Sequence, residues 1–265
     1  MRLGAVLVLC VVHLGCSKHE GRFEPAETAE RPSYDVMPLG RGDRIVIDGK
    51  LSEPAWRSSP ITRPFVDPGT GRTLPDNAPL GGTARLLYDE QFLYVAIVAR
   101  DINVTGGFPL DAIDPHLWTK DTVELMLDPE GDGDNLDYYE IQVNPQGLLF
   151  DSQFDRYNEP RVLPNGPFGH QEWNSELRRA VTIQGTLDNP SDIDEGYVVE
   201  MALPFRSLTK VKHLPPTPGT EWRANLYVMQ DNGGVCFSPI LGKGNFHKAS
   251  EFGKLKFGTN VSAQR

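Results

Sequence analysis

The sequence has few cysteines, and their positions limit what they can do. Of 265 residues, only Cys10, Cys16 and Cys236 are cysteines. Cys10 and Cys16 fall in an N-terminal segment that resembles an export signal, so no pair remains for a disulfide in the folded part of the chain. We expect Cys236 to be a small buried apolar residue, because a nucleophilic thiol would need a histidine beside it.

Positive charge is also scarce. The chain has 26 Lys and Arg against 36 Asp and Glu, which gives a formal net charge of -10 at pH 7. Proteins that bind nucleic acid depend on basic surfaces to neutralise phosphates. The composition therefore argues against nucleic acid as a partner and favours neutral ligands or cations.

Common catalytic and metal-binding signatures are missing. The sequence has no Walker-type loop, no HExxH, no GxSxG, no CxxC and no CxxCH haem-attachment motif. The six histidines are scattered without the spacing of metal ligands. Function must therefore be sought in the arrangement of the strands and not in a short motif.

The longest apolar run lies at the N-terminus, within MRLGAVLVLCVVHLGCS. A short apolar run after Arg2 that ends in small residues is typical of a secretory signal and is too short to span a bilayer as a mature helix. Leu14, Gly15 and Cys16 resemble a bacterial lipoprotein lipobox, which implies cleavage before Cys16 and lipid attachment to it. Ser17 at the next position favours an outer-membrane lipoprotein.

Composition divides the rest of the chain into three parts. Residues 17–38 are rich in Glu, Pro and Ala and too poor in apolar residues for a core, so we expect a flexible tether. Residues 39–258 have the length and composition of one large all-β domain, which we expect to be monomeric, and residues 259–265 form a tail.

Short segments of strand composition, separated by Gly, Pro, Asp and Asn, follow one another through this domain. With no sustained helical period, they predict an all-β fold, an antiparallel β-sandwich, with a hairpin at Asp89 and Glu90 and one helical turn at 204–208. The predicted strands are 44–47, 84–88, 92–100, 122–127, 138–143, 148–153, 180–184, 197–203 and 222–229.

The segment from Leu117 to Asn144 predicts a hairpin with one polar face. Apolar and mostly polar side chains alternate in residues 122–128 and 138–144, and the intervening DPEGDGDNLD is dense in turn formers. If Asp128 lies opposite Tyr138, the register places Glu124 against Gln142. The two polar sets then share a face.

Trp118 precedes this polar face. An aromatic wall beside carboxylate and amide groups suits a sugar, whose ring has an apolar C–H face and a belt of hydroxyls. An ordinary solvated sheet face would show a similar alternation, so both interpretations stay open at this point. Trp56 and Trp173 are expected to serve the core.

Seven stretches resemble, in one order, motifs of carbohydrate-binding module family 9 and its stand-alone relatives. The resemblance extends from about Arg44 to Phe257, and the shared order makes it specific. The family implies a β-sandwich that binds sugars between two tryptophans, with structural calcium and no catalysis. The stretches are IVIDGKLSEPAW, VAIVARD, WTKDTVELMLDPEGDG, YYEIQVNPQG, GYVVEMALPF, GTEWRANLYV and FHKASEFGKLKF.

The resemblance also implies particular site residues. Trp118 matches the first tryptophan of the clamp, and Glu124 matches the carboxylate that accepts from sugar hydroxyls. Gln142 falls where the family carries a basic residue, and Phe237 aligns with the second tryptophan. Arg223 is a further candidate for the same face, although a solvated strand residue would look the same.

The predicted turn between the two strands offers a candidate calcium site. Several carboxylates in a short segment can hold Ca²⁺, although their spacing is not that of an EF-hand. A solvated acidic turn explains the composition equally well. The candidate ligands are Asp128, Asp132, Asp134 and Asp137.

Three rival functions remain open. Glu124 and Glu140 would lie diagonally on one face, as the two carboxyls of a retaining glycosidase do. Haem domains of similar fold use Met with His or Lys, and Met126, Met201 and Met229 are available. A surface lipoprotein with a decayed sugar site is the third alternative, which the replacement of a tryptophan by Phe237 supports.

Overall fold

The computed structural model of the chain describes residues 31–162, 166, 168–242 and 245–259. The predicted signal peptide with Cys16 and the predicted tether up to residue 30 lie outside the described residues, as does the tail from residue 260. No helix in the described part of the chain is long and apolar enough to span a membrane.

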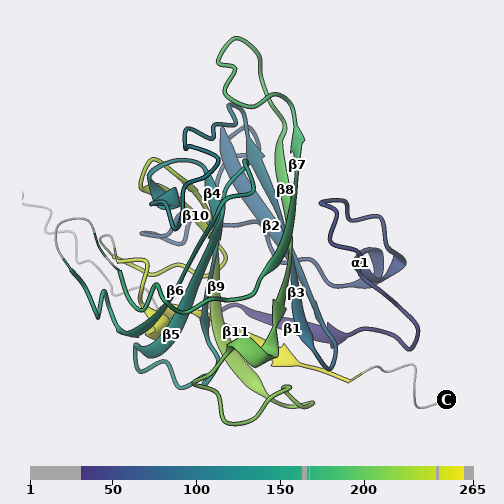
Figure 1. Ribbon diagram of the computed structural model, residues 1–265. Coiled ribbons are helices and arrows are strands. Elements are labelled where there is room, and N and C mark those ends of the chain that lie inside the picture. Colours follow the sequence, from purple (N-terminus) through teal and green to yellow (C-terminus); the bar gives the residue numbers. More distant parts are fainter. Residues whose placement is uncertain (1–30, 163–165, 167, 243–244, 260–265) are drawn as a thin grey trace, which may run out of the picture. The chain divides into compact units, whose positions relative to one another are not determined.

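The described residues form an all-β fold, as predicted, with strands that are longer than their sequence patterns suggested (Figure 1). The predicted hairpin at Asp89 and the helical turn after Pro204 are both present. The strands are β1 (Ser33–Pro38), β2 (Leu80–Tyr88), β3 (Phe92–Asp101), β4 (Thr122–Asp128), β5 (Leu136–Val143), β6 (Leu149–Arg156), β7 (Arg178–Gln184), β8 (Gly196–Pro204), β9 (Glu221–Gln230), β10 (Gly233–Cys236) and β11 (Gly253–Phe257). The helical elements are α1 (Pro54–Ser58), η1 (Leu117–Thr119), η2 (Phe205–Ser207) and η3 (Ala249–Glu251).

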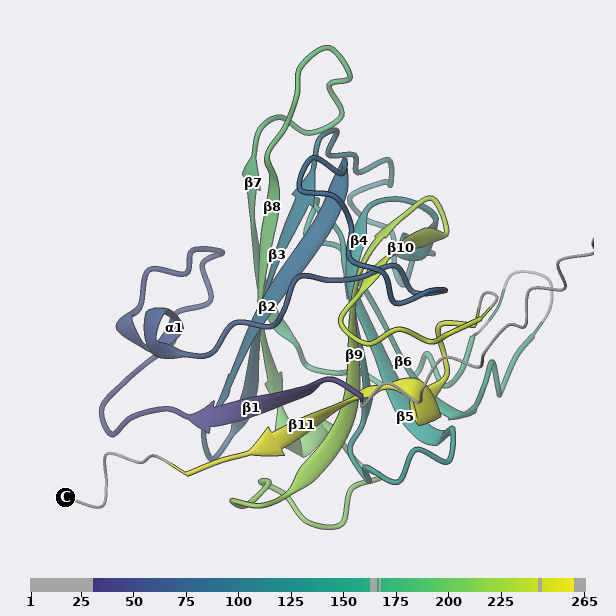
Figure 2. The same ribbon diagram turned by 180° about the vertical axis from the view of Figure 1, so that it is seen from behind.

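The strands follow the order β6-β5-β4-β9-β11-β1-β2-β3-β8-β7, with β10 paired to β9. All described strand pairs are antiparallel except those of β1, which runs parallel to both β11 and β2. The sheet is therefore mixed and strongly curled, where the sequence predicted a purely antiparallel sandwich. Figure 2 shows β1 and β11 crossing between the two halves of the sheet.

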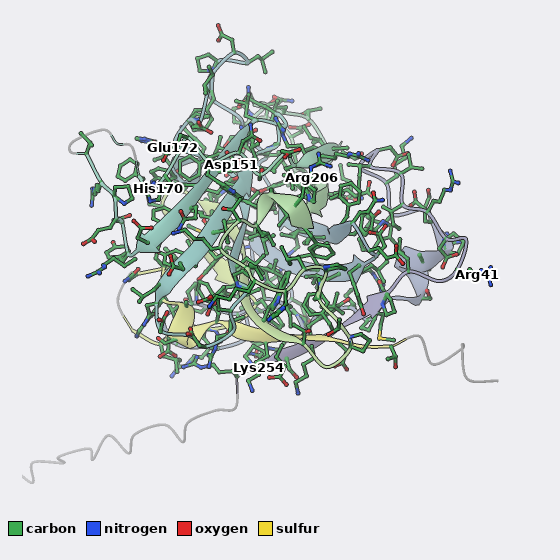
Figure 3. All side chains as sticks on the ribbon, turned by 60° about the horizontal axis from the view of Figure 1, so that its bottom comes forward. Arg41, Asp151, His170, Glu172, Arg206 and Lys254 are labelled. Atoms are coloured by element: carbon green, nitrogen blue, oxygen red, sulfur yellow. The ribbon has the colours of Figure 1, made fainter. Side chains whose placement is uncertain are left out.

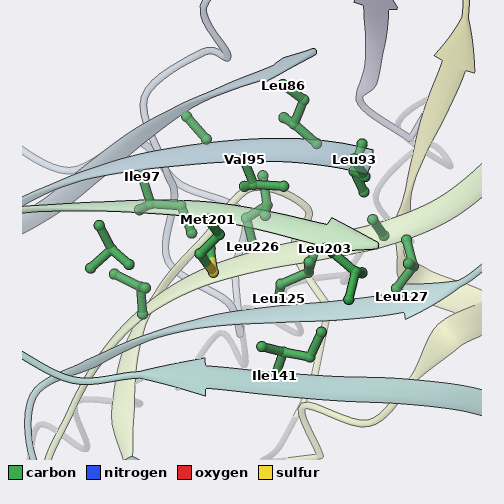
Figure 4. Close-up of a cluster of buried hydrophobic side chains, with 14 of the residues drawn as sticks. Leu86, Leu93, Val95, Ile97, Leu125, Leu127, Ile141, Met201, Leu203 and Leu226 are labelled. Carbon is green, nitrogen blue, oxygen red and sulfur yellow. The ribbon is translucent and has the colours of Figure 1, made fainter. Parts of the chain in front are cut away.

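The core lies between the two halves of this sheet (Figure 4). Alternate side chains of each strand point inward, because successive residues of a strand face opposite sides. Leu125, Ile141 and Leu226 from β4, β5 and β9 meet Val95 and Met201 from β3 and β8, and all five are fully buried. This packing leaves the other face of β4, β5 and β9 free to carry polar groups.

The predicted boundary of the tether at residue 38 is wrong. Residues 33–38 form β1, in which Tyr34 and Val36 are buried in the core. The Tyr34 hydroxyl lies 2.6 Å from the carbonyl oxygen of Pro60 and 2.9 Å from the amide of Leu86. Only two inward apolar side chains mark this strand, so the polar composition around them concealed it.

The predicted strand at 44–47 is also wrong. These residues are extended without ladder partners, and Ile45 and Ile47 pack on an apolar cluster around Trp56. The amides of Asp48 and Gly49 donate to Glu200 Oε2, each at 2.9 Å. The backbone amides that follow residues 44–47 are therefore hydrogen-bonded to a side chain and not to a neighbouring strand.

The aromatic residues expected to serve the core do so. Trp56 in α1 is fully buried and donates from its indole N–H to Glu200 Oε1 at 2.9 Å. Trp173 packs on Tyr139 with 4.8 Å between ring centroids and donates to the Ser207 carbonyl. Cys236 in β10 is buried and free, and burial raises the pKa of its thiol to about 12, as expected of a structural cysteine.

Candidate functional site

The β4–β5 hairpin has the register that the sequence predicted. Glu124 pairs with Gln142, and Met126 with Glu140. Val123, Leu125 and Leu127 point into the core, so the polar set points to the outer face of the sheet. This outer face is buried rather than solvated, because other segments cover it.

A cavity of about 360 Å³ lies over this face, within the size range of small-molecule sites. Strands β4, β5, β6 and β9 supply its floor. The segments around η1, after β6 and before η3 supply its walls, and Figures 1 and 2 show the last of these beside β5 and β6. The lining residues are Trp118, Glu124, Met126, Glu140, Phe150, Phe154, Tyr157, Asn158, Arg161, Phe168, Met229, Asn232, Asn245, Phe246 and His247.

Trp118 forms an aromatic wall of this cavity. His116 stacks on one face of the indole, with 4.5 Å between ring centroids and 20° between the planes. Phe150 and Phe168 meet the indole edge-on, at 5.2 and 5.5 Å. The Trp118 carbonyl accepts from the amide of Asn232 at 3.0 Å. These contacts hold the indole among its neighbours at the lining of the cavity.

Two glutamates and one glutamine form the polar floor. Gln142 Nε2 donates to Glu124 Oε2 at 3.2 Å and to Glu140 Oε1 at 2.5 Å. Since both carboxyls contact one nitrogen, they lie within about 6 Å of each other, where two unit charges repel by about 3 kcal/mol at an effective dielectric constant of about 20. Glu124 Oε1 and Gln142 Oε1 have no partner among the described residues.

Burial controls the protonation of this pair. It raises the pKa of Glu124 well above the usual value, and the charge of Glu140 raises it further. Burial likewise raises the pKa of Glu140 to about 8, against a smaller opposing effect of the hydrogen bond from Gln142. The two carboxyls therefore hold protons at a pH where an exposed glutamate is ionised.

His247 closes one side of the floor. Its Nδ1 lies 3.0 Å from the Tyr138 hydroxyl, and its Nε2 lies 3.7 Å from Glu140 Oε2. Burial lowers the pKa of His247 to about 3, so the imidazole is neutral and its contact with Glu140 is not an ion pair. Tyr138 is held in turn by stacking on Phe154 at 5.2 Å.

Residues 47–257 match a family model described as carbohydrate family 9 binding domain-like. The chain belongs to this family. Three solved structures share the fold. A family 9 carbohydrate-binding module from Caldicellulosiruptor kristjanssonii in complex with cellotriose has a TM-score of 0.57 and 17% identity, over 88% of this chain and 97% of the module.

The module from the same organism in complex with glucose gives a TM-score of 0.53 and 16% identity, over 87% of this chain and 97% of the other. A protein from Bacteroides uniformis gives a TM-score of 0.57 and 17% identity, over 86% of this chain and all of the other. No curated protein matches the sequence significantly.

The structure brings together only part of the family 9 site that the sequence predicted. Trp118 and Glu124 share the cavity. Gln142 is fully buried beneath it and holds the two carboxyls, so its expected contact with sugar hydroxyls is replaced by a positioning role. Glu140, which the sequence offered only for a rival function, lies in the floor beside Glu124.

The prediction that Phe237 is the second aromatic residue of the sugar site is wrong. Its side chain is buried in the main core and does not line the cavity. Phe246, nine residues later, lines the cavity instead and packs edge-on against Tyr227 at 5.2 Å. The motif FHKASEFG contained the residue, but the return of this segment over β5 cannot be deduced from local periodicity.

Arg223 does not reach the cavity. It lies opposite Asp128 in the sheet, and its guanidinium donates to the carbonyl oxygens of Gly131 and Ser250 at 3.1 and 3.3 Å. Arg223 therefore supports the β4–β5 turn, and it is a half-buried structural residue and not the solvated strand residue of the alternative interpretation.

The four candidate calcium ligands in this turn are not brought together. Asp128 accepts from the amides of Gly131 and Gly133, and Asp137 pairs with Lys210 at 3.4 Å. Asp132 and Asp134 are exposed and accept from amides two residues further on. No cluster of three or more His, Cys, Asp or Glu side chains suited to a metal occurs in the described parts of the chain.

The rim of the cavity after β6 was not predicted. Tyr157, Arg161 and Phe168 line it, and the Arg161 guanidinium lies over the Phe168 ring at 5.0 Å from the centroid. This segment returns to β6 at His170, which contacts Asp155 and Glu172 at 3.0 and 2.9 Å; Figure 3 shows His170 and Glu172 together at this edge of the molecule. These contacts raise the pKa of His170, chiefly through Asp155.

The buried pair should make the protein less stable as the pH rises. A carboxyl whose pKa is higher in the folded than in the unfolded chain binds more protons when folded, so the free energy of unfolding falls between its unfolded pKa and its folded pKa, here about 8 for Glu140. We expect Glu140→Gln to reduce this fall between about pH 5 and pH 8 by at least about 1.4 kcal/mol, one pKa unit. Urea unfolding across this range measures it.

The matched control is Glu90→Gln, which removes an exposed glutamate from the β2–β3 turn. This variant should keep the pH dependence of the parent protein. If Glu140→Gln also kept it, the pair would not be protonated by burial.

Proposed function

We propose that this protein binds a carbohydrate without transforming it, with a sugar ring stacked on Trp118 and sugar hydroxyls donating to Glu124 and Glu140. The observation that carries the proposal is that the indole of Trp118 and the buried carboxyls of Glu124 and Glu140 line one cavity. Such a cavity matches both sides of a pyranose, the apolar ring face and the hydroxyl belt. Phe246 supplies the second aromatic surface.

The relatives support a gluco-configured ligand. Family 9 modules of the same fold have been solved with cellotriose and with glucose. Low identity limits this likeness to the fold, so the choice of sugar here depends on the chain's own residues. The presence of both Trp118 and Phe246 in the lining of the cavity argues against a decayed site.

The geometry of the glutamates favours binding over hydrolysis. A retaining glycosidase places its two carboxyls on either side of the scissile bond and keeps one of them ionised as the nucleophile. Here both carboxyls extend from adjacent strands in one wall, contact one amide nitrogen and have raised pKa values. Neither is prepared to act as an ionised nucleophile at neutral pH.

A haem site has one observation in its favour, since Met126, Met229 and His247 line the same cavity. Met201 is buried in the core and is not part of this group. The ring nitrogens of His247 face Tyr138 and Glu140, and a buried acidic floor opposes the propionates of haem. The sugar therefore fits better, and a Soret band in the purified protein would reverse this choice.

Truncation of the indole tests the sugar site. Trp118→Ala should weaken binding of cellotriose at least about 30-fold, because loss of a stacked aromatic at the centre of a site costs about 2 kcal/mol or more. Isothermal titration calorimetry measures the affinity. Incubation of the parent protein with the same sugar, followed by chromatography, should show no products.

The matched control is Trp173→Ala, which removes a tryptophan packed on Tyr139 away from the cavity. It should lower stability and leave the affinity within about twofold. Equal losses in the two variants would mean that Trp118 acts through the fold and not through the ligand.

We also propose that Ca²⁺, implied by the resemblance to family 9 modules, binds beside Asp101, the last residue of β3, and Asp121, which immediately precedes β4. Both are almost fully buried, and their carboxyls contact each other. Asp101 Oδ2 receives no hydrogen bond from the described residues, and burial raises the pKa of Asp101 to about 7. Two buried carboxyls without a cation suit a hard divalent ion, with carbonyl oxygens or water completing its shell.

Calcium should therefore raise the melting temperature of the parent protein relative to a chelator, since a ligand that binds only the folded state stabilises it. Asp101→Asn should abolish this rise, and Asp132→Asn, in the β4–β5 turn, should keep it. Differential scanning calorimetry distinguishes the sites. If Asp132→Asn abolished the rise and Asp101→Asn kept it, the ion would bind in the β4–β5 turn instead.

We propose that the chain is exported and held at the outer membrane by lipid on Cys16, so that the domain meets polysaccharide at the cell envelope. The support is the sequence resemblance of residues 1–16 to a lipoprotein signal. Metabolic labelling with a fatty-acid analogue in a bacterial host should mark the protein, and Cys16→Ser should remove the label. Retention of the label in that variant would exclude Cys16 as the anchor.

A further inference from the structure

The floor of the cavity carries two acidic groups without a positive partner. Glu124 and Glu140 are its two acidic residues, and Arg161, at the exposed rim, is the one cationic residue among the described residues that line the cavity. We propose that the sugar site prefers an amino sugar, whose ammonium group would lie between the carboxyls of Glu124 and Glu140. This inference rests on the proposed sugar binding and adds the chemical class of the ligand.

The hydrogen-bonding capacity of the pair is only partly used. Gln142 provides one nitrogen for two carboxyls, and Glu124 Oε1 receives nothing from the described residues. A buried carboxylate oxygen without a donor is unfavourable, more so when a second carboxylate stands beside it. An ammonium group would supply three hydrogen-bond donors and a positive charge beside Glu124 Oε1, where the described residues supply neither.

The other groups that face the pair do not compensate its charge. His247 is neutral because burial lowers its pKa to about 3. Burial keeps Tyr227 protonated and raises the pKa of Tyr138 in the same way, so neither changes charge near neutral pH. The titratable and charged groups around the pair, from all elements packed against it, are Tyr138, Tyr157, Arg161, Tyr227 and His247.

Arg161 does not occupy the position between Glu124 and Glu140 that the ammonium group would take. Its guanidinium lies over Phe168 at the rim and makes no ion pair with Glu124 or Glu140. The positive charge of a ligand at the floor is thus opposed only from the solvent-exposed side, where water screens it.

A cation and a neutral hydroxyl differ in how they affect the charge of the Glu124–Glu140 pair. A hydroxyl donates one hydrogen bond and leaves the charge of the pair unchanged, so the carboxyls must keep a proton or repel each other. An ammonium group neutralises one carboxylate, and its hydrogen bonds to carboxylates are about twice as strong as neutral ones. The fixed indole of Trp118 holds the same pyranose ring in either case, and adds attraction for a cation near its face.

The experiment compares ligands that share one ring. Glucosamine, glucose and N-acetylglucosamine are titrated into the parent protein by calorimetry at neutral pH, with methylamine as a cation that has no ring. Glucosamine should bind at least about tenfold more tightly than glucose or N-acetylglucosamine, and methylamine should not bind measurably. The ratio should fall as the pH is lowered, because the ammonium group must displace a proton from the pair and the pair holds its protons more firmly at lower pH.

Two variants test the residues. Glu140→Gln should bring the ratio of the glucosamine and glucose affinities close to one, and Glu124→Gln should do the same if Glu140→Gln does not fold. Glu90→Gln, which removes one negative charge far along the chain in the β2–β3 turn, should keep the ratio of the parent protein and thereby excludes a general effect of net charge.

The outcomes separate this inference from the proposed function. Binding of glucose and glucosamine with equal affinity, or an unchanged ratio in both glutamate variants, overturns the amino-sugar preference and leaves sugar binding intact. Failure of every sugar, including cellotriose, to bind overturns both. Tight binding of methylamine alone would show an ammonium site that does not use the sugar ring, which also overturns the inference.

Discussion

The sharing of one amide nitrogen by two buried carboxyls is the constraint on which the rest of the site depends. Gln142 joins Glu124 and Glu140 side by side on the outer face of β4 and β5 through one nitrogen. Burial then raises the pKa of both carboxyls, and the charge of Glu140 raises that of Glu124 further. The acidity of the cavity and its dependence on pH follow from this arrangement.

The fold tolerates such a floor because stability comes from the opposite face of the same strands. Val123, Leu125 and Leu127 alternate with Glu124 and Met126, so each strand contributes to the core and to the cavity at once. Apolar burial in the core is large enough to offset an unfavourable polar cluster behind it. The covering segments bury the floor, and burial strengthens its electrostatic interactions.

The parts of the structure that follow from local alternation could be predicted, and the parts that depend on distant segments could not. The pairing of Glu124 with Gln142 came directly from the period of two and the turn composition. Phe246 and His247 reach the cavity because the segment before η3 returns over β5, which no pattern in that segment reveals. β1 was missed for a similar reason, since it pairs with β11 from the far end of the chain.

The acidic floor also explains how a family 9 site can change its ligand without changing its architecture. In the proposed site, Trp118 would contact a ring face, which differs little among hexoses, so it would provide affinity with little discrimination. Discrimination must come from polar groups whose needs are met by one ligand and not by another. Gln142, where the resemblance implied a basic residue, brings no positive charge to the floor, and a neutral His247 brings none from above it. A site with this charge imbalance favours the ligand that corrects it, and the same imbalance, in the absence of ligand, lowers the stability of the folded protein as the carboxyls lose their protons.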